Sequence, residues 1–286
     1  MAGDPASKRT TASSGRVVIT TGTTSGIGLA TAVELARRGW VSIATYRSTR
    51  KLATLEAAAG RAGVTVHPVR LDVTDAEACE NTVREVVERH GALHALVNNA
   101  GYGLTGAVED TSDEEARQLL ETMVVAPARL CRLALPHLRA AGGGRIVNVS
   151  SIYGRTTTPL SGWYQASKHA LEGLTDALRA EVASDRIHVI LVEPGGFRTD
   201  IWEEQGIANP SERYETAYRR THRALELADP LLGNPATCAR VIAGALQSRM
   251  PRARYLVGSD AHLLAAVMPL TPSVVKDRIT RIVLGL

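Results

Sequence analysis

The chain has 286 residues, of which 44% are hydrophobic, and a formal net charge of +4 at pH 7. This length and composition are enough for one sizeable hydrophobic core. The positive charge is too small and too dispersed to favour nucleic acid as a partner, and no segment approaches the roughly 20 consecutive apolar residues of a membrane span.

Residues 1–15 are rich in Ser, Thr, Gly and Ala and contain no apolar run. This composition predicts a disordered tail and argues against a signal peptide. The three cysteines, Cys79, Cys131 and Cys238, lie far apart and form no Cys-x-x-Cys motif. They are typical of buried thiols in a reducing compartment, so we expect a cytoplasmic protein.

From residue 16 onward, strand-like and helix-like segments alternate. The apolar, β-branched runs predict strands at 17–20, 41–46, 64–71, 95–98, 145–150, 188–192 and 254–257. Helical stretches are predicted near 26–38, 50–60, 75–90, 113–140, 162–183 and 235–248. This alternation predicts an α/β fold with a doubly wound parallel sheet of the Rossmann type, formed by one domain over residues 16–286.

A glycine-rich turn at residues 21–28 separates the first strand from the first helix, the context in which glycines bind a dinucleotide. Gly22 allows a tight turn, Gly26 lets backbone amides approach a pyrophosphate, and Gly28 lets helix and strand pack closely. The alternative is a flexible loop that happens to contain three glycines. We expect this turn to contact the cofactor through Gly22, Thr24, Ser25, Gly26, Ile27 and Gly28.

The end of the second strand, Ala44-Thr45-Tyr46-Arg47, bears on which cofactor is used. Enzymes that use NAD place a carboxylate here for the ribose 2′-hydroxyl, but no Asp or Glu occurs between Trp40 and Leu55. The Arg47 guanidinium could instead pair with a 2′-phosphate. The alternative is a solvated loop arginine. The missing carboxylate favours NADP(H).

Tyr164 and Lys168 are four residues apart in a predicted helix, so their side chains share one face. An ammonium beside a phenol favours the charged form and lowers the pKa of the phenol. The pair is therefore a candidate acid and base for exchanging a proton with a carbonyl or an alcohol.

Six motifs between about Arg16 and Thr199 resemble the short-chain dehydrogenase/reductase family, and they occur in the family's order. They are Thr21-Gly22-x-x-x-Gly26-x-Gly28, Asp72-Val73, Asn98-Asn99-Ala100-Gly101, Ser151, Tyr164-x-x-x-Lys168 and Pro194-Gly195-x-x-x-Thr199. Within the family, the chain looks most like the hydroxysteroid and retinol dehydrogenases, which act on lipophilic carbonyl compounds.

The resemblance implies catalytic roles for Ser151, Tyr164 and Lys168. It also implies cofactor contacts, which we expect from Asp72, Val73, Asn98, Ala100, Gly101, Tyr164, Lys168, Pro194, Gly195 and Thr199. Asp72 could equally cap the turn before Thr74, and Asn99 could serve only to secure its own turn.

One position departs from the family pattern. Met123 stands where the family usually carries an Asn that joins the lysine and a water in a proton relay. A thioether donates no hydrogen bond and accepts only weakly. The departure leaves open a relay through other waters, slow proton resupply, or different chemistry.

Residues 197–235 break the alternation and contain a basic cluster formed by Arg213, Arg219, Arg220, His222 and Arg223. We expect a helical lid over the substrate, because this insertion follows a strand end where ligands bind. The alternative is a surface helix with a solvated charged face. A phosphate-bearing carrier attached to the substrate is a further candidate partner for the cluster.

These observations predict an NADPH-dependent oxidoreductase that interconverts a small lipophilic ketone or aldehyde and its alcohol. Two alternatives stay open: dehydratase-like or cyclase-like chemistry on the same scaffold, and an NADP-binding regulatory protein. No metal site is expected from the eight histidines. The resemblance also implies a homodimer or homotetramer, paired through the helices at 113–140 and 162–183.

Overall fold

The computed structural model describes residues 15–202 and 210–286. Apart from Gly15, the predicted tail at 1–15 lies outside the described residues, as do residues 203–209 of the predicted lid.

Seven parallel strands form one sheet in the order β3-β2-β1-β4-β5-β6-β7. The strands are β1 (Val17–Thr20), β2 (Val41–Tyr46), β3 (His67–Arg70), β4 (Ala95–Asn98), β5 (Gly144–Val149), β6 (Ile187–Pro194) and β7 (Arg254–Val257). The order reverses direction between β1 and β4, as in a doubly wound sheet. The predicted fold class is confirmed, although β3 is shorter than the predicted strand at 64–71.

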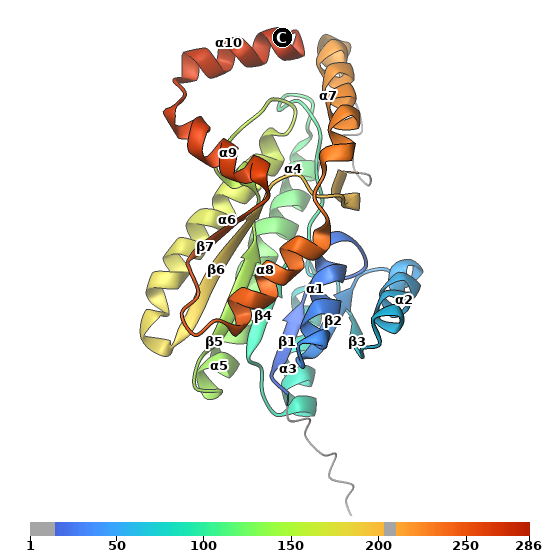
Figure 1. Cartoon of the computed structure of the whole chain (residues 1–286), viewed down its shortest axis with the longest axis vertical. Coiled ribbons are helices and arrows are strands. Elements are labelled where there is room, and N and C mark those ends of the chain that lie inside the picture. The colour runs from blue at the N-terminus through green and yellow to red at the C-terminus, as the bar shows by residue number, and fades with distance from the viewer. Residues whose placement is uncertain (1–14, 203–209) are drawn as a thin grey trace, which may run out of the picture.

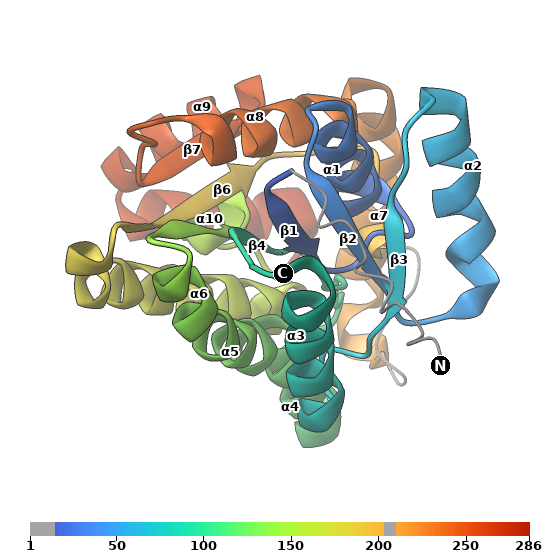
Figure 2. The same ribbon diagram turned by 90° about the horizontal axis from the view of Figure 1, so that it is seen from below.

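Ten α-helices occur among the described residues. The helices are α1 (Gly26–Arg37), α2 (Leu52–Ala62), α3 (Ala76–His90), α4 (Asp113–Leu120), α5 (Ala126–Ala140), α6 (Gly162–Glu181), α7 (Glu215–Ala228), α8 (Pro235–Gln247), α9 (Ser259–Val267) and α10 (Ser273–Leu284). Figure 2 shows α1 and α8 on one side of the sheet and α3, α5 and α6 on the other. No helix in the described part of the chain is both long and apolar enough to cross a membrane.

The strands are buried on both faces because helices cover both sides of the sheet. In β1, Val17 and Ile19 belong to the core beneath α3 and α5, whereas Val18 belongs to the core beneath α1 and α8. This two-residue alternation explains why the strand is a continuous apolar run instead of alternating with polar residues. The three cysteines are buried in these cores as free thiols.

The long helix predicted at 113–140 is interrupted. A π-helical turn, η2 (Glu121–Val125), separates α4 from α5. Such turns insert one extra residue into a helix and are frequent at functional sites. Met123 lies in the middle of this turn.

The parallel topology brings the loops that follow β1, β4, β5 and β6 to the same edge of the sheet. In Figure 1, α7, α9 and α10 gather at this end of the molecule. The segments that carry the predicted site residues therefore converge at one place.

Candidate active site

The glycine-rich turn after β1 has the shape of a cradle that side chains would fill. Gly22 and Gly26 have φ angles of +68° and +52°, a region that L side chains rarely adopt. A Cβ on Gly22 would lie 2.8 Å from Cα of Ala100, and a Cβ on Gly28 would lie 2.0 Å from the carbonyl oxygen of Gly22. The close approach of backbones that the sequence predicted is therefore present.

The N-terminus of α1 faces this cradle without a competing anion. Ser25 is the N-cap, but its side chain caps no backbone N–H, and the first turn contains no acidic residue. The first N–H groups and the positive end of the helix dipole are thus available to a pyrophosphate. Together with the glycines, this arrangement fits a dinucleotide cofactor.

The two asparagines after β4 have separate roles. The Asn99 side chain donates to the carbonyls of Thr21 and Gly22 at 2.9 and 3.0 Å, so it secures the glycine turn. Asn98 is buried, and its amide donates to Asn148 Oδ1 at 2.8 Å. The Asn98 amide nitrogen is therefore used inside the core, and the predicted contact of Asn98 with the cofactor stays a prediction.

The second and third strands end in residues placed as the sequence predicted. Arg47 follows β2 and is exposed, so its guanidinium can reach a ligand. Asp72 follows β3, and its Oδ1 accepts hydrogen bonds from both the N–H and the hydroxyl of Thr74. Asp72 therefore caps the turn with one oxygen, and Val73, which follows it, is buried.

The end of β6 lies against the glycine turn and the C-terminal helices. A Cβ on Gly26 would lie 2.9 Å from Thr199 Cγ2, so the motif Pro194-Gly195-x-x-x-Thr199 closes the cradle from one side. On the other side, Asp260 of α9 accepts a hydrogen bond from the N–H of Gly196 at 2.5 Å.

Ser151 and Tyr164 meet at the carboxyl end of β5. Ser151 follows the strand, and its Oγ accepts a hydrogen bond from the N–H of Tyr153 at 3.2 Å. Its side chain is hydrogen-bonded to the Tyr164 phenol, which stacks edge-on against the Tyr153 ring. The Tyr153 N–H occupies one lone pair of Oγ, which leaves the hydroxyl proton and the second lone pair for other partners.

Lys168 lies one turn below Tyr164 on α6 and is buried. Its Nζ donates to the carbonyl of Val149 at 2.9 Å and lies 5.8 Å from the centre of the Tyr164 ring. Burial lowers the pKa of Lys168 to about 8, and the nearby charge of Glu172 opposes this shift. The predicted triad of Ser151, Tyr164 and Lys168 is thus assembled.

The pKa of Tyr164 moves in the direction opposite to the one expected from its spacing to Lys168. Burial raises the pKa of the phenol, while the hydrogen bond from Ser151 lowers it to a lesser extent. Burial disfavours the phenolate, and this cost outweighs the stabilisation that the Ser151 hydrogen bond gives it. We therefore expect the Tyr164 phenol to be protonated near neutral pH.

Met123 contributes packing and no polar group. Its side chain is buried in a cluster with Tyr102, Leu119 and Tyr164. A Cβ on Gly101 would lie 2.5 Å from Met123 Sδ, so the thioether lies against the loop after β4. The assignment of Met123 to the relay position agrees with this placement beside Tyr164.

A network of paired charges around the buried Glu193 was missed by the sequence reasoning. Glu193 of β6 is fully buried and pairs with Arg155 at 2.7 Å and with Arg254 at 3.2 Å. Arg254 also pairs with Glu172 and Asp176 of α6. Tyr164, Lys168, Glu172 and Asp176 repeat every four residues, which was the one available signal that they share a helix face.

The predicted lid contacts the site. Tyr218 of α7 packs against the cluster that contains Tyr164, and its hydroxyl accepts a hydrogen bond from the N–H of Ala107 at 2.7 Å. Asp110 accepts hydrogen bonds from the Tyr218 hydroxyl and from Ser211. These contacts dock α7 onto the loop between β4 and α4.

Part of the basic cluster in the lid is used within the fold. Arg213 and Arg219 lie 3.7 and 3.9 Å from Glu109 and Glu215, and Arg220 donates to the carbonyls of Ile282 and Val283. The described residues contain no group of three or more His, Cys, Asp or Glu placed to hold a metal ion.

Comparison with known proteins decides the family. The sequence profile of the short chain dehydrogenases matches residues 16–209. The chain belongs to the short-chain dehydrogenase family. The NADPH-dependent 3-dehydrocapnine reductase of Ornithobacterium rhinotracheale is 31% identical, over 92% of this chain and 95% of that protein.

Two solved structures of family members are similar throughout. A short-chain dehydrogenase from Streptomyces avermitilis is 36% identical, with a TM-score of 0.76 over 90% of this chain and 95% of that one. A metagenomic short-chain oxidoreductase in complex with NADP is 28% identical, with a TM-score of 0.69 over 86% of this chain and 98% of that one.

We predict that Glu172→Gln moves the alkaline limb of the pH profile for reduction to lower pH. Lys168 acts as an ammonium, and because its pKa is about 8, activity should fall as the pH rises through that value. Removing the Glu172 carboxylate removes the charge that favours the protonated form, so the pKa of Lys168 should fall further.

The measurement is kcat/KM against pH for both proteins. Asp176→Asn is the matched control, since Asp176 also pairs with Arg254 but lies one turn farther from Lys168. An equal shift in both variants, or no shift in Glu172→Gln, would contradict the role assigned to Glu172.

Proposed function

We propose that this protein is an NADPH-dependent carbonyl reductase that interconverts a ketone or aldehyde and its alcohol. The observation that carries the proposal is the buried Tyr164 phenol, hydrogen-bonded to Ser151 and with the Lys168 ammonium one helical turn away. These groups lie beside a cradle that fits a dinucleotide.

In reduction, Tyr164 donates its proton to the substrate oxygen. Its raised pKa keeps the phenol protonated before the reaction, and Ser151 donates a hydrogen bond to the same oxygen as negative charge develops there. Lys168 supplies a positive charge that stabilises the resulting tyrosinate. A nicotinamide cofactor held by the glycine turn would supply the hydride.

The NADP(H) assignment rests on the end of β2. Arg47 is exposed at that end, and no carboxylate lies between Trp40 and Leu55 to receive a ribose 2′-hydroxyl. The NADPH dependence of the 3-dehydrocapnine reductase and the NADP bound to the metagenomic relative support the same choice.

The side chains around Tyr164 favour a lipophilic substrate. Tyr102, Leu104, Leu119 and Met123 form an apolar cluster with it, and Ile201 and Tyr218 pack against that cluster from the proposed lid. An apolar wall binds hydrocarbon and excludes water. The exposed cations of α7 would still allow a phosphate-bearing carrier on the substrate, although several of them are engaged within the fold.

Met123 favours one second candidate, cofactor-assisted chemistry without net redox change, such as dehydration or cyclisation. The buried thioether supplies no proton to a relay. Substrate-dependent oxidation of NADPH separates the two proposals, because a dehydratase or cyclase would convert substrate while the NADPH concentration stayed constant.

We predict that the protein binds NADPH more tightly than NADH and that Arg47→Ala removes this preference. Loss of one charge-assisted contact to the 2′-phosphate should cost about 1.5–3 kcal/mol in NADPH binding. Titration of both cofactors measures it. NADH affinity should be unchanged in Arg47→Ala, and Arg61→Ala on α2 is the control for loss of a surface arginine. Equal affinities in the unmodified protein would refute the assignment.

We predict that Tyr164→Phe abolishes reduction and leaves NADPH binding nearly intact, because the ring remains and only the proton donor is lost. Ser151→Ala should lower kcat on the order of a hundredfold. Tyr153→Phe, which removes the hydroxyl of the adjacent ring, is the matched control and should retain activity. Full reductase activity in Tyr164→Phe would show that another group is the acid.

We also propose a homodimer or homotetramer paired through α4, α5 and α6. Leu130 and Leu171 are buried within the subunit, whereas Leu174 and Val125 are 44% and 45% exposed. Gly173 leaves open space beside Leu174, so α6 offers a flat apolar face to another helix. Light scattering at micromolar concentration tests this pairing, and a monomeric mass would contradict it.

A further inference from the structure

Exposed hydrophobic side chains are concentrated at the C-terminal end of the chain. Of the sixteen large hydrophobic residues that are exposed among the described residues, nine lie between residues 263 and 286. They are Leu263, Val267, Leu270, Val274, Val275, Ile279, Ile282, Val283 and Leu286. Single exposed apolar residues are ordinary, but a group of this size marks an interaction surface.

Helix α10 turns its apolar face away from the protein. Val275, Ile279 and Ile282 follow the spacing of one helix face and are 46%, 56% and 69% exposed. On the other side, Lys276 donates to Thr157 Oγ1 at 2.8 Å, and Leu284 packs against a small buried cluster that includes Leu160. A surface helix ordinarily does the reverse and buries its apolar face.

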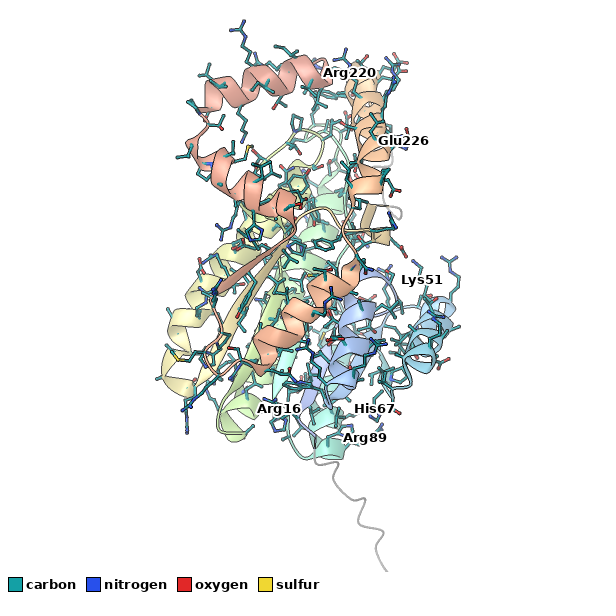
Figure 3. The ribbon with its side chains drawn as sticks, viewed as in Figure 1. Arg16, Lys51, His67, Arg89, Arg220 and Glu226 are labelled. Atoms are coloured by element: carbon teal, nitrogen blue, oxygen red, sulfur yellow. The ribbon has the colours of Figure 1, made fainter. Side chains whose placement is uncertain are left out.

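Specific contacts hold α10 in this orientation. Arg220 of α7 donates to the carbonyls of Ile282 and Val283, both at 3.1 Å, near the end of α10 (Figure 3). Gly285 ends the helix in the left-handed conformation, and a Cβ there would lie 2.9 Å from the Arg220 guanidinium. These tertiary contacts therefore fix the rotation of α10 so that its apolar face points outward.

Helix α9 joins this surface to the active site. Asp260 in its first turn bonds the N–H of Gly196, next to the Pro194-Gly195 motif. Leu263 and Val267 of α9 are exposed, as is Leu270 in the short 3-10 helix that follows α9. Figure 1 shows α9 and α10 together at the end of the molecule where the loops of the site converge.

Basic residues flank the apolar face. In α10, the exposed Arg278 and Arg281 outnumber the single acidic residue, Asp277. In α7, Arg219 and Arg223 add exposed positive charge. Apolar side chains beside cations are the pattern of a helix that lies in the headgroup region of an anionic bilayer. A second copy of the chain suits this face less well, because a symmetric contact would bring the same cations together.

We infer that the α9–α10 surface docks on an anionic lipid membrane, and that the substrate carbonyl belongs to a lipid held in that membrane. The first half of this inference stands on the exposed face and its charges alone. The second half rests on the proposed reductase function, because the loops that carry the site residues lie at this same end of the molecule.

The test is co-sedimentation of the full-length protein with vesicles of phosphatidylcholine, with and without phosphatidylglycerol. Binding should require the anionic lipid and should weaken with added salt. The double substitution Ile279→Glu and Ile282→Glu should reduce binding on the order of tenfold or more, and Ile279→Ser alone should reduce it less. Met250→Glu is the matched control, because Met250 is 85% exposed between α8 and β7, away from this surface, and binding should be unchanged.

Unchanged vesicle binding in the double variant, or no binding by the unmodified protein, would overturn the docking. A double variant that lowers the mass measured by light scattering, without vesicle binding by the unmodified protein, would instead make the face a contact between copies and would also overturn it. Circular dichroism and thermal unfolding of each variant ensure that a loss of binding does not reflect unfolding.

Activity readouts separate this inference from the proposed function. Oxidation of NADPH with a short free ketone should be the same in the double variant as in the unmodified protein, whereas turnover of a long-chain ketone in anionic vesicles should fall. Vesicle binding without any NADPH oxidation would leave the docking in place and refute the reductase. Reduction of the free ketone without vesicle binding would support the reductase and refute the docking.

Discussion

The hydrogen bond from Lys168 to the carbonyl of Val149 is the contact on which the site depends, because it ties α6 to the end of β5. Ser151 follows Val149 by two residues, and Tyr164 precedes Lys168 by one helical turn. Fixing one lysine to one carbonyl therefore brings the hydroxyl and the phenol together. The ammonium is buried, and its partners are the backbone carbonyl and the nearby Glu172 charge. A buried charge without such partners would be costly, so the strand end and the helix constrain each other.

The cofactor cradle depends on a comparable tie across the switch point of the sheet. Thr21 Oγ1 accepts hydrogen bonds from the N–H groups of Asn99 and Ala100, both at 2.9 Å, and the Asn99 amide returns two bonds to the turn after β1. Gly22 can approach the backbone of Ala100, in the loop after β4, only because no Cβ stands between them. This one set of hydrogen bonds thus fixes both the turn that precedes α1 and the loop that follows β4.

The side chains around Lys168 differ from the family pattern, because an apolar residue replaces an Asn and the nearby polar groups come from α6. Where an Asn would join a proton relay, Met123 packs against Gly101 and Tyr164. Charge is instead supplied from the next turns of α6, where Glu172 and Asp176 meet Arg254, and Arg254 meets the buried Glu193. Such a network is stable only when each charge is paired, so it fixes α6, β6 and β7 relative to one another. The result is an apolar cluster on one side of Tyr164 and a carboxylate, Glu172, whose charge favours the protonated Lys168.

The sequence by itself determined what local geometry controls. The alternation of apolar runs set the strands and helices, the three glycines set the turn before α1, and the four-residue spacing placed Tyr164 and Lys168 on one face. The tertiary structure alone decided which asparagine turns inward, because Asn98 and Asn99 are identical in type and differ only in which side of β4 they face. It also decided the direction of the Tyr164 pKa, since burial is a property of the assembled site. The orientation of α10 could not be predicted from the sequence for the same reason. Its amphipathic pattern defines two faces, but the contacts of Arg220, Thr157 and Leu284 determine which face packs against the protein. Spacing along a chain fixes which side chains share a face, whereas burial and distant partners fix what that face contacts.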